Sequence, residues 1–151
     1  MLQGVFLGFD FGTKYIGIAV GQTITQSARP LTTLTAHQGV PSWEALTKLI
    51  HEWQPKGLVV GLALQLDGSH SPTSLKAKQF GHRLNQHFNL PIFFIEERLT
   101  TVAARERLKE IYPDPYYQQD VDAMSAAIIL ESWFKSSPKE ISIHVSNISS
   151  I

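Results

Sequence analysis

The 151-residue sequence contains no cysteine. This absence excludes disulfide bonds, thiol catalysis and thiolate metal sites, and it leaves imidazole and oxygen groups as the ligands available to a metal. The sequence also has no net charge, since 13 lysines and arginines balance 13 aspartates and glutamates. A nucleic-acid partner would therefore have to be met by a local patch of charge rather than by the overall field of the protein.

Long apolar runs are absent as well. No stretch approaches the ~20 consecutive apolar residues of a membrane span, and the N-terminal segment lacks the basic start of a signal peptide and meets Asp10 early. We therefore expect a soluble, cytoplasmic protein with no membrane partner. With 43% hydrophobic residues the chain can bury a sizeable core, and its length fits one domain.

The apolar patterns that are present predict a mixed α/β fold. Two runs rich in β-branched and aromatic residues, joined by a short glycine-containing turn, indicate a β-hairpin, and a third run extends it into an antiparallel meander. Helical periodicity then alternates with two continuous apolar runs typical of buried strands. The predicted strands are Val5 to Phe11, Tyr15 to Gly21, Pro30 to Thr35, Leu58 to Leu64 and Pro91 to Ile95, and the predicted helices lie between Pro41 and Pro55 and over Ser74 to Phe88, Thr101 to Ile111 and Gln119 to Phe134.

This order of elements predicts the domain organisation. Parallel neighbours need helical crossovers, so we expect one mixed sheet with helices packed on its faces. We assign residues 1–136 to this domain and 137–151 to a C-terminal tail. The alternation of Ile141, Ile143 and Val145 leaves two options for the tail, an edge strand or a loose segment.

Three carboxylates stand in positions where an isolated charge is costly. Alternation puts Asp10 on the face of its strand shared by Phe6 and Gly8. Asp122 lies just inside the apolar run of the last helix, and Glu97 follows a strand at the edge where ligands collect in parallel sheets. The ordinary alternatives are an ion-paired core acid for Asp10, a helix cap for Asp122 and a turn residue for Glu97. Converging together, the three would make an all-oxygen site for a hard cation such as Mg²⁺.

Four segments resemble the signature blocks of a known family. They read LGFDFGTKYIGIAVG, VVGLALQLDG, EERLTT and DVDAMSAAIILES, and in order and spacing they are similar to those of the YqgF/RuvX family of ribonuclease H-like nucleases. The resemblance covers the chain to about Phe134. It implies the ribonuclease H-like α/β fold, a catalytic and metal-binding triad of Asp10, Glu97 and Asp122, and a nuclease role in 5′-end processing of pre-16S rRNA.

The expected cofactor and partners follow from phosphodiester hydrolysis, which needs a water in line and relief of charge on the leaving oxygen. Two divalent ions can supply both, so we expect Mg²⁺ or Mn²⁺, as two ions with substrate bound, and Asp10 as the bridging ligand. The expected partner is nucleic acid, either precursor rRNA or branched DNA, with a ribosome precursor as a further option. We expect a monomer or a weak homodimer.

Substrate phosphates would be met by basic residues. One lysine lies in the predicted hairpin turn near Asp10, one arginine directly follows Glu97, and the stretch from Lys76 to Lys109 holds seven basic residues against three acidic ones. Such a local excess is a candidate phosphate track, although ordinary solvated helix faces would give the same pattern. The candidate substrate-binding residues are Lys14, Arg98, Lys78 and Arg105.

Alternatives of other kinds remain open. The family resemblance also allows resolution of Holliday junctions in DNA, and the chain could bind nucleic acid or a ribosome precursor without cutting it. The segments Asp10 to Thr13 and Ile16 to Ala19 also resemble the phosphate loop of the actin and sugar-kinase superfamily. Those proteins close two large domains over ATP, and 151 residues supply only one.

Overall fold

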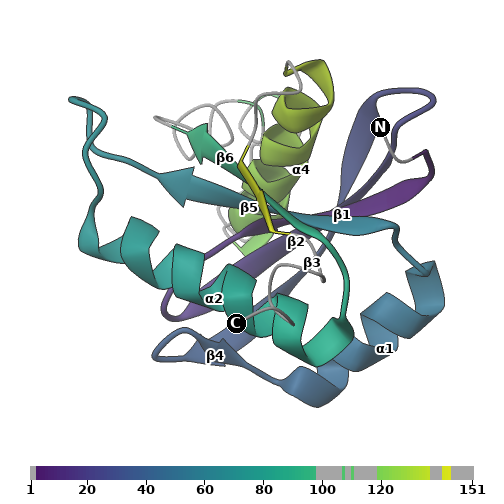
Figure 1. Ribbon diagram of the computed structural model, residues 1–151, viewed down its shortest axis with the longest axis horizontal. Helices are drawn as coiled ribbons and strands as arrows, with labels where there is room; N and C mark the ends of the chain where they lie inside the picture. Colours follow the sequence, from purple (N-terminus) through teal and green to yellow (C-terminus); the bar gives the residue numbers. More distant parts are fainter. Residues whose placement is uncertain (1–2, 98–106, 108–109, 111–118, 137–140, 144–151) are drawn as a thin grey trace.

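The computed structural model describes residues 3–97, 107, 110, 119–136 and 141–143. This part of the chain forms a seven-stranded mixed sheet with helices on both faces (Figure 1). The strands are β1 (Val5–Asp10), β2 (Tyr15–Gln22), β3 (Ser27–His37), β4 (Val40–Pro41), β5 (Gly57–Ala63), β6 (Ile92–Glu97) and β7 (Ile141–Ile143), and the helices are α1 (Trp43–Trp53), α2 (Pro72–Phe88) and α4 (Gln119–Lys135).

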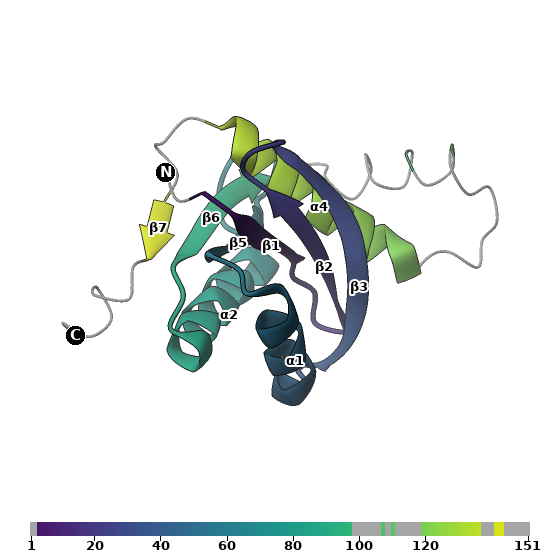
Figure 2. The same ribbon diagram turned by 90° about the vertical axis from the view of Figure 1, so that its right-hand side faces the viewer.

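The sheet order is β4-β3-β2-β1-β5-β6-β7. The first three strands form the predicted antiparallel meander, and β1, β5 and β6 run parallel. Helices α1 and α2 cover one face of the sheet and α4 covers the other (Figure 2). The predicted mixed sheet with helices on its faces is therefore confirmed.

Most predicted elements are present, with shifted boundaries. Strand β3 is longer than expected because it pairs with β2 from Ser27 onward. Helix α2 begins before Ser74 because Ser71 caps it: the Ser71 hydroxyl accepts from the Ser74 backbone N–H at 3.0 Å, and the Ser74 hydroxyl accepts from the Ser71 N–H at 2.8 Å. Strand β4 was not predicted. The helix predicted over Thr101 to Ile111 lies outside the described residues, apart from positions 107 and 110.

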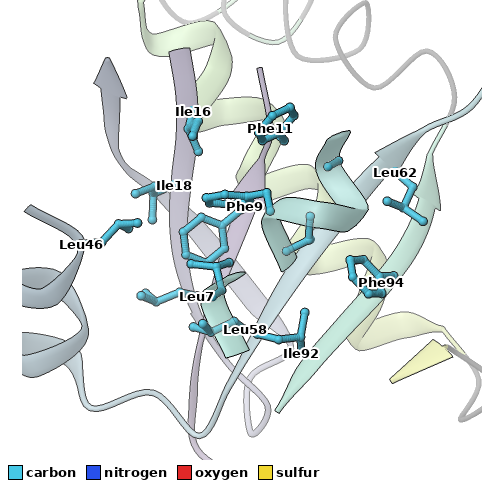
Figure 3. Packing of buried hydrophobic residues seen from close by; sticks show 14 of the residues in the cluster. Leu7, Phe9, Phe11, Ile16, Ile18, Leu46, Leu58, Leu62, Ile92 and Phe94 are labelled. Atoms are coloured by element: carbon cyan, nitrogen blue, oxygen red, sulfur yellow. The ribbon is translucent and has the colours of Figure 1, made fainter. Parts of the chain in front are cut away.

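One face of β1 builds the larger hydrophobic core. Leu7, Phe9 and Phe11 point toward α1 and α2 and pack with Ile16 and Ile18 of β2 (Figure 3). The alternation predicted for β1 is thus correct, since Phe6 belongs to a separate cluster on the α4 side.

The other face of the sheet is fitted to α4 by glycines. A Cβ atom at Gly8 would lie 2.9 Å from the Leu130 Cβ and 3.0 Å from the Ala126 carbonyl oxygen. A Cβ atom at Gly17 would overlap the Asp122 carbonyl group. Strand glycines of this kind mark a close approach of backbone, so the deeply packed last helix that the sequence predicts lies directly on β1 and β2.

The tail contributes one strand. Strand β7 pairs antiparallel with β6, so Ile143 lies opposite Ile92 and Ile141 opposite Phe94. Residues 141–143 therefore form the last strand in the sheet order. None of the described helices is long and apolar enough to cross a membrane.

Candidate active site

Asp10 and Glu97 lie on one face of the sheet at its carboxyl edge. Each is the last residue of a strand, and β1 and β6 both run parallel to β5. Two residues earlier in these strands, Gly8 lies against α4 and Ile95 packs in the core cluster on the α4 side. Because side chains two apart share a face, both carboxylates lie on the face that α4 covers.

Asp122 reaches the same place from the helix. Its backbone rests on Gly17, and Gly17 is the direct partner of Asp10 in the β1–β2 pair. Because α4 packs on β2 at this point, Asp122 lies beside Asp10. All three acidic side chains are partly buried.

The electrostatics of Asp10 reflect this arrangement. Burial of the carboxyl group, the negative charge of Asp122 and, more weakly, that of Glu97 raise the pKa of Asp10 from 3.8 to about 7, while the Ser125 hydroxyl acts in the opposite direction. The structure therefore brings Asp122 and Glu97 within electrostatic reach of Asp10, with Asp122 exerting the stronger effect.

The donor chemistry of these acids fits a hard divalent cation. Carboxylate oxygens are the ligands that Mg²⁺ and Mn²⁺ prefer, and a positive charge among them would offset the repulsion that raises the pKa of Asp10. As placed, no three acidic or histidine side chains of the described chain form a group that closes around one ion. Asp122 and Glu97 therefore act on Asp10 electrostatically, but the three side chains do not form a complete coordination shell.

The predicted basic residues differ in their relation to the acids. Lys14 is exposed in the turn between β1 and β2, and its carbonyl accepts a hydrogen bond from the Ala36 N–H at 2.7 Å, which ties the turn to β3. This turn directly follows Asp10. Lys78 lies on α2, on the opposite face of the sheet, so the structure does not bring it together with the acids. Arg98 and Arg105 lie outside the described residues.

Two residues beside the acids were missed by the sequence reasoning. Gly17 seats the start of α4, and Ser125 lies one helical turn after Asp122 and affects Asp10. The signal for the first was a glycine in the interior of a strand, which indicates close backbone approach. The signal for the second was a lone hydroxyl in an alanine-rich stretch of an apolar helix.

Two relatives match most of the chain. The chain is 52% identical over 135 residues to a protein of Pseudomonas paraeruginosa named "Putative pre-16S rRNA nuclease", and the match covers 89% of this chain and 94% of the relative. A protein of the same name from Nitrosococcus oceani is 48% identical over 129 residues, which cover 85% of each chain.

Solved structures share the fold at low sequence identity. RuvC of T. thermophilus in complex with a Holliday junction substrate matches with a TM-score of 0.50 and 17% identity, covering 87% of this chain and 93% of that one. The Fowlpox virus resolvase in complex with Holliday junction DNA matches with a TM-score of 0.52 and 11% identity, covering 89% and 99%. These likenesses confirm the predicted ribonuclease H-like fold.

A family model agrees with the four sequence blocks. The model, described as RuvX, Holliday junction resolvase, matches residues 4–136. This range contains all three acids and ends before the tail. The chain therefore belongs to the RuvX, Holliday junction resolvase, family.

Proposed function

We propose that this chain is a divalent-cation-dependent nuclease that hydrolyses phosphodiester bonds in the 5′-end processing of pre-16S rRNA. The observation that carries the proposal is the electrostatic contact of Asp10 with Asp122 and Glu97 at the carboxyl edge of the sheet. Partly buried acidic side chains that repel one another are typical of cation-binding and catalytic sites. The RNA substrate is supported by the name of relatives that are about half identical over most of the chain.

Asp10, Asp122 and Glu97 would hold Mg²⁺ or Mn²⁺, as two ions with substrate bound. When bound, such ions stabilise charge on the phosphate and supply a nucleophilic water. The contribution of the chain is to fix three carboxylates from three separate elements on one face of the sheet. Asp10 would act in its ionised form, so in the metal-free chain the proton held by its raised pKa would compete with the cation.

The basic residues would hold the substrate backbone. Lys14, exposed in the turn after β1, would contact a phosphate close to the acids. Arg98 directly follows Glu97, and with Arg105 it would extend the contact along the chain. Lys78 lies on the other face of the sheet, so only a substrate that passes around the sheet edge would reach it.

Cleavage of two substrates side by side tests this function. A precursor 16S rRNA fragment and a synthetic four-way DNA junction are incubated with the wild-type chain in Mg²⁺, in Mn²⁺ and in EDTA. Asp10→Asn removes the charge of the central acid, and Glu52→Gln, on the exposed side of α1, is the matched control. We expect cation-dependent cutting of the RNA, loss of cutting in Asp10→Asn and normal cutting in Glu52→Gln.

The other outcomes separate the alternatives. Symmetric cutting of the junction alone would assign a resolvase, and it would require two copies of the chain acting together. Binding of either substrate without cutting in both cations would assign a binding module. Either result would refute the proposed RNA nuclease.

A further inference from the structure

Ser125 carries a hydroxyl group that the packing does not need. Three polar residues are buried among the described residues, namely Ser74, Asn85 and Ser125. The Ser74 hydroxyl belongs to the capping box of α2, and the Asn85 side-chain amide donates to the Leu90 carbonyl at 2.7 Å. The Ser125 hydroxyl, with its residue 0% exposed, makes no hydrogen bond of good geometry to the protein.

Such a hydroxyl lowers stability. A buried hydroxyl without a partner costs about 1–3 kcal/mol of desolvation. Its neighbours Ala123, Ala126 and Ala127 in the same helix are also buried, so an alanine at position 125 would fit the same space without that cost. The packing alone therefore gives no reason for a serine here.

The position of Ser125 points to Asp10. Ser125 lies three residues after Asp122, so both lie on the same stripe of α4. Within that stretch of the helix, the Asp122 backbone rests on Gly17 and the Ala126 carbonyl lies against Gly8. Asp10 is opposite Gly17 and two residues beyond Gly8, so the hydroxyl lies beside its carboxyl group. The Ser125 hydroxyl also favours the ionised form of Asp10.

We propose that Ser125 is a positioning residue, whose hydroxyl donates a hydrogen bond to the ionised Asp10 carboxylate and holds it in the orientation used for cation and substrate. This inference rests on the proposed function, because it assigns Asp10 a task at the site. It adds a residue that has no direct contact with substrate and that acts only through Asp10.

The two fully buried serines provide a matched pair for the test. Ser125→Ala and Ser74→Ala each remove one hydroxyl from a residue that is 0% exposed. Melting temperature, Mn²⁺ affinity by calorimetry, and kcat and KM for nucleic-acid cleavage are measured in alkaline buffer, where Asp10 is ionised. Loss of an outer hydrogen bond to a metal ligand typically lowers metal affinity or activity by about 10–100-fold.

We expect opposite results from the two substitutions. Ser125→Ala should lower Mn²⁺ affinity and kcat by about tenfold and leave KM nearly unchanged. Ser74→Ala should lower the melting temperature, because it breaks the capping box, and leave kcat and Mn²⁺ affinity unchanged. In the Asp10→Asn background, Ser125→Ala should cause no further loss of Mn²⁺ affinity.

Failure of the proposed role of Ser125 can be distinguished from failure of the proposed function. If the wild-type chain cleaves nucleic acid and Ser125→Ala matches it in kcat and Mn²⁺ affinity, the role of Ser125 is refuted while the proposed function stands. The same refutation follows if Ser125→Ala lowers only the melting temperature. If the wild-type chain neither binds Mn²⁺ nor cleaves any nucleic acid, both proposals fail.

Discussion

Replacing Asp10 by asparagine should stabilise the protein at neutral pH and leave its stability at acidic pH unchanged. The pKa of Asp10 is raised to about 7 in the folded chain, against 3.8 as the ordinary value. Between these values the folded state binds more protons than the unfolded state, so the free energy of unfolding falls as pH rises through this window. An amide of nearly the same shape carries no charge and removes that loss.

The size of the effect follows from the shift. One pKa unit corresponds to about 1.4 kcal/mol, so the full shift sets an upper limit of about 4 kcal/mol. Solvent reaches the partly exposed carboxyl group and screens its interactions, which reduces the expected gain to about 1–2 kcal/mol. For a chain of this length that gain raises the melting temperature by about 2–8 °C.

Thermal unfolding at two pH values is the assay. Wild type, Asp10→Asn and the surface control Glu52→Gln are melted in EDTA at about pH 4 and about pH 8, on either side of the window. The gain of Asp10→Asn should appear only at the higher pH, and Glu52→Gln should follow wild type at both. A melting temperature of Asp10→Asn below that of wild type at the higher pH, or an equal gain at both, would refute the reasoning.

Three further predictions concern the same edge of the sheet. Gly17→Ala should lower the free energy of unfolding by about 2 kcal/mol and abolish cleavage, because the new methyl group displaces the start of α4; chemical denaturation that leaves stability unchanged would contradict this. Lys14→Ala should weaken nucleic-acid binding and flatten the slope of log affinity against log salt by about 0.7–0.9, whereas Lys48→Ala on α1 should do neither in anisotropy titrations. Mn²⁺ affinity should rise with pH up to about 7, because the proton on Asp10 competes with the cation; calorimetry giving a flat profile would count against Asp10 as a ligand.

Much of the fold could be predicted because its signals are local. Alternation in β1 separates Leu7 and Phe9 from Phe6, and the structure puts these residues in different clusters. The start of α2 was harder to predict, because its capping box uses Ser74 where the usual pattern has Glu or Gln. Strand β4 spans only two residues and so carries no periodicity.

The acids of the candidate site could be singled out because charge in an apolar segment is costly. Their relative influence on Asp10 could not be predicted, since it depends on how α4 lies over Gly17, which is a tertiary contact. The face of the sheet on which Lys78 lies could have been predicted. Strands β1, β5 and β6 follow one another in the sheet, and two right-handed crossovers in the same direction put α1 and α2 on one face, away from the face of Asp10.

The packing of α4 on β1 and β2 also determines when the site forms during synthesis of the chain. Asp10 lies near the beginning of the chain and Asp122 near the end of the folded core. Contacts between such distant segments form late, because a long loop must close before they give any stabilisation. A nascent chain that has left the ribosome only as far as β6 holds Asp10 and Glu97 without the helix that covers them. The acidic cluster is therefore assembled only after α4 has been translated and has docked, so incomplete chains carry no finished site next to the ribosomes that make them.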